Sequence, residues 1–95
     1  MKKILFTLLL LPLATYSQVG IGTTSPDNSS MLEIVATDKG VLVPRVAILD
    51  LNTAAPVTAP IESLLVYNII VATGVGFHYW DGSKWTPLGG AAGND

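Results

Sequence analysis

Two aromatic runs separated by a short turn are the most constraining feature of this 95-residue chain. Residues 76–80 read Gly-Phe-His-Tyr-Trp and residues 84–88 read Lys-Trp-Thr-Pro-Leu, with Asp-Gly-Ser between them. Aromatic residues favour strands, and an Asp-Gly-Ser sequence favours a tight turn. Residues 76–88 are therefore predicted to form a β-hairpin, and the chain is predicted to belong to the all-β class.

The position of the turn decides which side chains of this hairpin face each other. If residues 82–83 form a two-residue loop, Trp80 and Trp85 lie directly opposite and share one face. If residues 81–82 form the loop, Trp85 lies opposite His78 instead. The sequence leaves both registers open.

The N-terminus has the layout of a secretory signal peptide. Two lysines precede an apolar stretch over residues 4–13, and the small residues Thr15 and Ser17 follow it. We expect a signal helix over residues 1–17, cleavage after Ser17, and a secreted or cell-surface location. A membrane anchor is the alternative, but the apolar stretch has only about half of the roughly 20 residues that span a bilayer.

The chain that remains after this cleavage is weakly acidic and has no cysteine. Residues 18–95 carry three basic and seven acidic side chains, which gives a net charge of −4. Without a basic cluster, neither nucleic acid nor anionic lipid is an expected partner. A small exported domain often needs a stabilising device besides its core. Without disulfides or His/Cys metal clusters, we expect that device to be association with copies of the same chain.

Short strands are predicted between the signal and the hairpin. Residues 31–37 and 41–43 are expected to be extended, and Pro44 marks a strand end or an edge. Residues 46–51 fit either a strand or a helical turn. Residues 64–71 are almost continuously apolar, which predicts a strand buried on both faces. In so small a chain, burial of both faces implies packing against other copies.

No group of residues predicts a catalytic, cofactor or metal site. His78 is the only histidine. A lone histidine in a strand is more often a packed or a surface residue than a catalytic one, and no nucleophile motif lies nearby. The one candidate contact surface consists of Tyr79, Trp80 and Trp85, whose rings could stack on a glycan. The alternative is that these rings pair across the hairpin and are buried at a subunit interface, because exposed aromatic surface is costly.

Five blocks of sequence stand out in order along the chain: VGIGTTSP at 19–26, LEI at 32–34, KGVLVPR at 39–45, APVTAP with LLVYN at 55–68, and YWDGSKW at 79–85. Together they resemble a family of exported Bacteroidetes-type surface proteins that are similar to phage tail fibres. The resemblance implies the N-terminal module of a homotrimeric fibre and carries no catalytic residue onto this chain. Two departures are a short segment at 69–75 and an end at Asp95, where the fibre body usually continues.

These observations predict three segments. Residues 1–17 are a signal peptide, residues 18–88 a small β-rich module completed by trimerisation, and residues 89–95 a flexible tail or the start of a missing fibre body. We expect a non-enzymatic structural or assembly module of a cell-surface fibre or adhesin, without a cofactor. The alternative function is glycan binding through Tyr79, Trp80 and Trp85, and a surface glycan or another surface protein is a further possible partner.

Overall fold

The computed structural model describes residues 17–89, which fall into two compact units, residues 17–40 and residues 41–89. Both units consist of short strands, and η2 (Val71–Thr73) is a single turn of 3-10 helix. The predicted all-β class is confirmed. The expected signal helix lies outside the described residues. Across residues 17–89, no helix has the length and apolar character needed to cross a membrane.

The first unit holds a two-stranded parallel sheet. Its strands are β1 (Val19–Ile21) and β2 (Leu32–Ile34), and Val19 lies beside Leu32 in the register. The predicted strand over residues 31–37 is therefore shorter than expected. Asp38 and the residues around it form a bend and leave the ladder.

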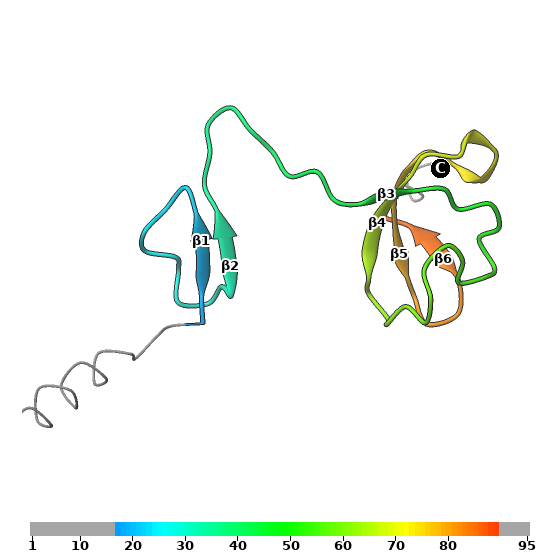
Figure 1. Cartoon of the computed structure of the whole chain (residues 1–95), viewed down its shortest axis with the longest axis horizontal. Coiled ribbons are helices and arrows are strands. Elements are labelled where there is room, and N and C mark those ends of the chain that lie inside the picture. The colour runs from blue at the N-terminus through cyan, green and yellow to red at the C-terminus, as the bar shows by residue number, and fades with distance from the viewer. Residues whose placement is uncertain (1–16, 90–95) are drawn as a thin grey trace, which may run out of the picture. The chain divides into compact units, whose positions relative to one another are not determined.

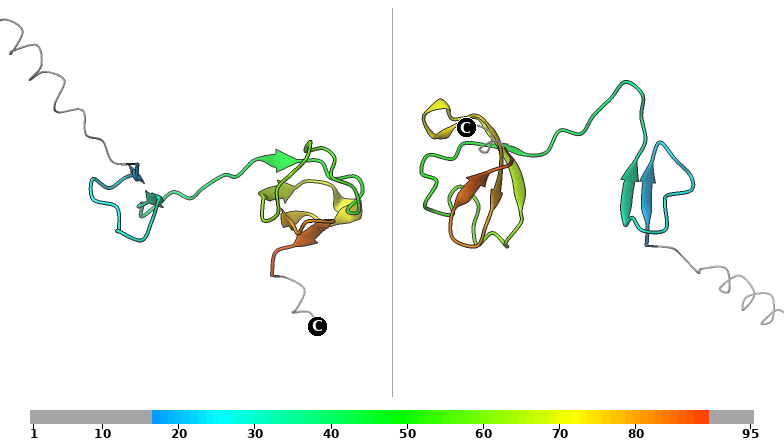
Figure 2. Two further views of the ribbon diagram at one scale, coloured as in Figure 1. Left: turned by 90° about the horizontal axis from the view of Figure 1, so that it is seen from below. Right: turned by 180° about the vertical axis from the view of Figure 1, so that it is seen from behind.

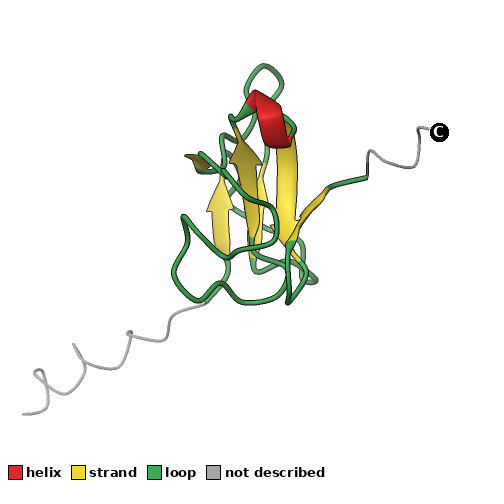
Figure 3. Cartoon of the chain, turned by 90° about the vertical axis from the view of Figure 1, so that its right-hand side faces the viewer, coloured by secondary structure: helices red, strands yellow, loops and turns green. Residues whose placement is uncertain are grey.

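The second unit holds a four-stranded mixed sheet (Figure 1). In spatial order its strands are β3 (Arg45–Val46), β4 (Leu65–Asn68), β5 (Gly76–Trp80) and β6 (Trp85–Pro87). β3 runs parallel to β4, whereas the pairs β4–β5 and β5–β6 are antiparallel. The predicted hairpin is the β5–β6 pair. Figure 3 shows η2 at one end of this sheet.

A proline stands at each edge of the four-stranded sheet. Pro44 immediately precedes β3, and Pro87 is the last residue of β6. Pro87 has no N–H and cannot donate a hydrogen bond to a further strand, whereas the Pro44 carbonyl accepts from the Tyr67 N–H and faces β4. The prediction that Pro44 marks a strand end or an edge is confirmed.

One face of this sheet carries the core of the second unit. Val66, Trp80 and Trp85 point to this inner face and pack with Ile48, which comes from the loop of residues 47–64. That loop runs alongside the sheet from the end of β3 to the start of β4 (Figure 2). Trp85 holds this loop with two hydrogen bonds. Its backbone N–H donates to the Leu51 carbonyl, and its ring N–H donates to the Ala54 carbonyl.

The prediction of a long strand over residues 64–71 is wrong in length, and within the single chain only one of its faces is buried. β4 ends at Asn68, and its side chains alternate between a buried inner face and an accessible outer face. Val66 is buried, whereas Leu65 lies on the outer face and is exposed. A continuous apolar run hides this period-two alternation, because both faces carry apolar side chains.

The strand β4 ends where Asn68 bonds to the chain that surrounds it. The Asn68 Oδ1 accepts hydrogen bonds from the N–H groups of Ile48 at 2.9 Å and Ile70 at 3.2 Å. Its Nδ2 donates to Thr73 Oγ1 at 2.9 Å and to the Gly74 carbonyl at 2.8 Å. This fully buried amide links the loop after β3 to the turn before β5.

Two other segments have less regular structure than the sequence predicts. Residues 41–43 are extended but pair with no strand of the described chain, and residues 47–51 form neither a strand nor a helix. Ile48 lies in the second of these segments and is fully buried. Val46 is the last residue of β3, and residues 47–51 adopt neither of the two predicted structures. Contact with the tryptophans and the hydrogen bonds of Ile48 to Asn68 and Thr73 hold this segment.

Candidate assembly surface

The hairpin adopts the register in which the two tryptophans face each other. Trp80 pairs directly with Trp85, and their ring centroids lie 5.2 Å apart with an interplanar angle of 67°. The Asp81 N–H donates to the Lys84 carbonyl at 3.0 Å, which closes a two-residue loop over residues 82–83. The first of the two predicted registers is therefore confirmed.

Asp81 fixes this register through its carboxylate. Oδ1 accepts the N–H groups of Ser83 at 2.8 Å and Lys84 at 2.9 Å, and Oδ2 accepts the Thr86 hydroxyl at 3.0 Å. The two N–H bonds, with Ser83 first, lower the pKa of Asp81 from 3.8 to about 2 because they stabilise the charged form. Gly82 has a φ of +103°, which a residue with a side chain rarely adopts.

The hairpin does not present the three predicted contact residues as one surface. Trp80 is 9% exposed and Trp85 is 1% exposed, and both belong to the core of their own chain. Tyr79 points to the opposite face and is half-buried, because neighbouring residues of a strand alternate sides. We expected these rings to be buried at a subunit interface. For both tryptophans, the loop of residues 47–64 of the same chain provides this burial instead.

His78 is a packed residue, which is one of the two non-catalytic alternatives that the sequence left open. It lies on the inner face, opposite Val66, and is almost fully buried. Its Nδ1 is 3.0 Å from the Gly76 carbonyl oxygen and carries a proton, because a carbonyl only accepts. Its Nε2 is buried and has no hydrogen-bond partner among residues 17–89.

The outer face of the four-stranded sheet carries aromatic side chains that the core does not cover. Leu65 pairs with Tyr79, and Tyr67 pairs with Phe77, so these four side chains form two adjacent rows on one face. The rings of Tyr67 and Phe77 meet edge to face, with centroids 5.1 Å apart. Leu65 is 38% exposed and Phe77 is 45% exposed. We call these four residues the outer aromatic face.

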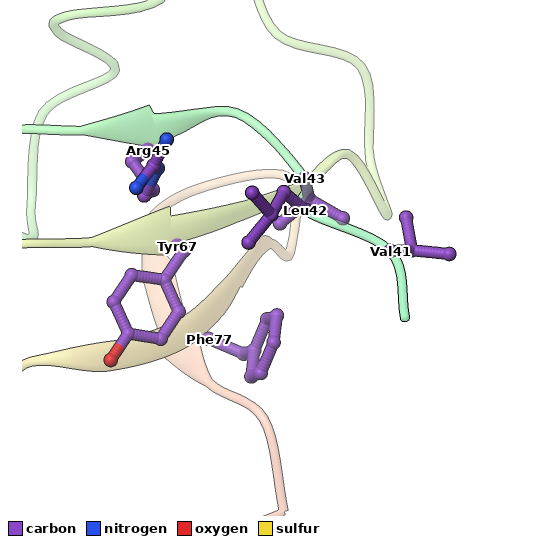
Figure 4. Close-up of a pocket in the computed structure, with 6 residues that line it drawn as sticks. All are labelled: Val41, Leu42, Val43, Arg45, Tyr67 and Phe77. Atoms are coloured by element: carbon purple, nitrogen blue, oxygen red, sulfur yellow. The ribbon is translucent and has the colours of Figure 1, made fainter. Parts of the chain in front are cut away.

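A groove of about 360 Å³ borders this face (Figure 4). The extended segment before β3 forms one wall, and the rings of Tyr67 and Phe77 form the other. The six lining residues are Val41, Leu42, Val43, Arg45, Tyr67 and Phe77. Five of the six are hydrophobic or aromatic, so the groove suits an apolar partner surface better than a charged ligand.

The sequence missed most of the outer aromatic face. It singled out Tyr79 but not Leu65, Tyr67 or Phe77. The alternation within β4 could have revealed this face. Once Val66 is assigned to the core, the odd-numbered residues of β4 must point outward. In the described part of the chain, no three His, Asp or Glu side chains gather where they could hold a metal ion.

The geometry defines a small all-β module with an apolar sheet face that its own unit leaves uncovered. A sequence model of the family described as phage tail like trimerisation region matches residues 20–95, so the chain belongs to this family. The comparisons with curated proteins and with solved structures found no match. The chain is a tail-fibre-like structural module that assembles as a trimer. The predicted likeness to phage tail fibres and the predicted trimer are confirmed.

Proposed function

We propose that this chain is a non-enzymatic assembly module of an exported cell-surface fibre or adhesin. Its role is to bring three copies together, and the outer aromatic face is a principal contact between them. The observation that carries the proposal is this uncovered apolar face in a chain that belongs to a trimerisation family. The signal-peptide layout of residues 1–17 supports export and a place at the surface.

The outer aromatic face suits contact with another copy because of its composition and its rigidity. Burying a large apolar side chain fully is worth about 1.5–3 kcal/mol, so the half-exposed Leu65 and Phe77 would each gain about 1 kcal/mol on association. Tyr67 and Phe77 already hold each other in place, so little side-chain freedom is lost on contact. The face also continues into the apolar groove formed by residues 41–43.

Sedimentation equilibrium of the full-length gene product tests this proposal. The unaltered chain should sediment as a trimer at micromolar concentration. The variant Phe77→Asp places a charge on the outer aromatic face and should shift the population towards monomer. Val71→Asp is the matched control, because Val71 is exposed in η2 and is not part of that face.

Tryptophan emission shows whether each variant keeps its fold, because Trp80 and Trp85 are buried within one chain. A folded, monomeric Phe77→Asp variant beside a trimeric Val71→Asp variant supports the proposed contact. A monomeric unaltered chain at micromolar concentration contradicts the assembly function. A trimeric Phe77→Asp variant would leave the function in place and move the contact elsewhere.

Glycan binding through the hairpin is a second candidate function. The observation in its favour is an open hollow of about 530 Å³ on the outer face, lined by Tyr79, Leu65 and Leu88 among others. Tyr79 would stack on the sugar, whereas the buried Trp80 and Trp85 would hold the strand in place. Titration of the chain with a broad panel of glycans, followed by tryptophan emission and calorimetry, tests this candidate. The absence of any response across the panel would refute it.

A further inference from the structure

The parallel pair β1–β2 has an aliphatic face without any cover in its own unit. Val19 and Leu32 are register partners, as are Ile21 and Ile34, so the four side chains share one face of the sheet. They are 50%, 55%, 54% and 40% exposed, respectively. In residues 17–40 no side chain is buried. We call these four residues the β1–β2 aliphatic face.

The opposite face of the same pair is covered by the loop that joins the two strands. A Cβ atom added at Gly20 would lie 2.6 Å from the Thr23 carbonyl oxygen and 2.9 Å from Pro26, so glycine is required for this close approach. The Asp27 N–H donates to Glu33 Oε1 at 2.6 Å and ties the loop to β2. The loop therefore covers the side of β1–β2 that carries Gly20 and Glu33, and leaves the aliphatic side uncovered.

A parallel pair of three-residue strands needs apolar burial to stay ordered. Ordering each residue costs about 1–2 kcal/mol of backbone entropy. Two strands without a covered hydrophobic face are marginal at best in water. A partner on the aliphatic face would therefore stabilise the register of β1 and β2.

We propose that the β1–β2 aliphatic face packs against the same face of two other copies at the threefold axis of the trimer. This proposal rests on the assembly function proposed above and adds a second contact to it. The family match begins inside β1 and includes all of β2, so this pair lies within the trimerisation region. The face carries no charge or hydrogen-bonding side chain. A threefold axis brings one identical face from each copy to the same point, where Val, Ile and Leu side chains fill the centre.

The general spacings of strands and sheets are compatible with three β1–β2 pairs around one axis. Two paired strands are about 5 Å apart, and sheets that pack face to face lie about 10 Å apart. Three two-stranded ribbons around one axis would therefore leave a centre that four aliphatic side chains per copy can fill. The β1–β2 loop and its polar bonds would remain on the outside.

Thiol cross-linking of the full-length chain tests the contact without adding a charge to it. The sequence has no cysteine, so each substitution introduces the only thiol. Ile34→Cys places that thiol on the β1–β2 aliphatic face. Thr24→Cys is the control, because Thr24 is exposed in the loop over the opposite face. Each variant is treated with a short bis-maleimide and separated on a denaturing gel, and its oligomeric state is measured beforehand by sedimentation.

We expect Ile34→Cys to form covalent dimers about tenfold faster than Thr24→Cys, because assembly raises the local thiol concentration. Trimeric chains in which Ile34→Cys reacts no faster than Thr24→Cys would overturn this contact and leave the assembly function intact. Such a result would place another part of the same chain, or no partner, on the face. Monomeric chains would overturn both proposals.

Discussion

Asn68→Ala removes the side chain that joins three segments of the second unit. The N–H of the fully buried Ile48 loses its acceptor, and the partly buried Ile70 N–H loses the same acceptor. The Gly74 carbonyl loses the donor that Asn68 Nδ2 supplies. An unsatisfied buried polar group costs about 1–3 kcal/mol, and the partly buried groups fall at the low end. The free energy of unfolding of the variant should be about 3–5 kcal/mol lower, in a domain whose total is typically about 5–15 kcal/mol.

Urea unfolding followed by tryptophan emission measures this loss, because Trp80 and Trp85 are buried beside the same core. The chain concentration must be equal in all samples, since assembly links stability to concentration. Asn52→Ala is the matched control. Asn52 is exposed, and its side chain makes no hydrogen bond within residues 17–89. Its variant should stay within about 0.5 kcal/mol of the unaltered chain.

Asn68→Asp separates the two halves of the amide. The new carboxylate still accepts from Ile48 but turns an oxygen towards the Gly74 carbonyl, where a donor is needed. This buried oxygen pair leaves the Gly74 carbonyl without a donor, so the variant should be less stable than the unaltered chain at pH 7. For the first variant, Asn68→Ala, a decrease in the free energy of unfolding of less than about 1 kcal/mol would refute the structural role of the amide.

Three further predictions concern the hairpin and the N-terminus. The pKa of Asp81 is lowered from 3.8 to about 2, so its carboxylate stabilises the fold above pH 3.8 and this contribution is lost as the pH falls towards 2. Asp81→Asn should therefore lower stability at pH 5 but remove this part of the acid sensitivity, as measured by urea unfolding between pH 5 and pH 2. Trp85→Ala should destabilise the chain by about 3–5 kcal/mol in the same assay, and Leu88→Ala, an exposed control, by far less. Mass spectrometry of the exported protein should find Gln18 at the N-terminus, and a retained Met1 would contradict cleavage after Ser17.

The hairpin could be predicted from the sequence because its determinants are local. The Asp-Gly-Ser turn and the flanking aromatic residues lie within 13 positions of one another. The register remained open because either pair of turn residues satisfies the same pattern. The bonds of the Asp81 carboxylate to Ser83, Lys84 and Thr86 decide it, and sequence spacing does not reveal them.

The distribution of side chains between the two faces of the sheet was harder to predict. Tyr79 and Trp80 were grouped as one surface, although adjacent residues of a strand point to opposite sides. Along β4 the apolar side chains of both faces hide the alternation, so the uncovered Leu65 and Tyr67 resemble the buried Val66 in sequence. Asn68 carried no visible signal, because its partners Ile48 and Gly74 lie 20 and 6 positions away.

The two edges of the four-stranded sheet limit how copies of this chain can join. A sheet with free edges invites the strands of neighbouring molecules to add on without end, which leads to fibrils and precipitates. Here Pro87 withholds a donor at the outer edge of β6, and β3 offers only two residues for pairing. Growth by strand addition is therefore disfavoured, and a contact through faces around a symmetry axis closes on itself. This geometry favours an assembly that stops at a fixed number of chains.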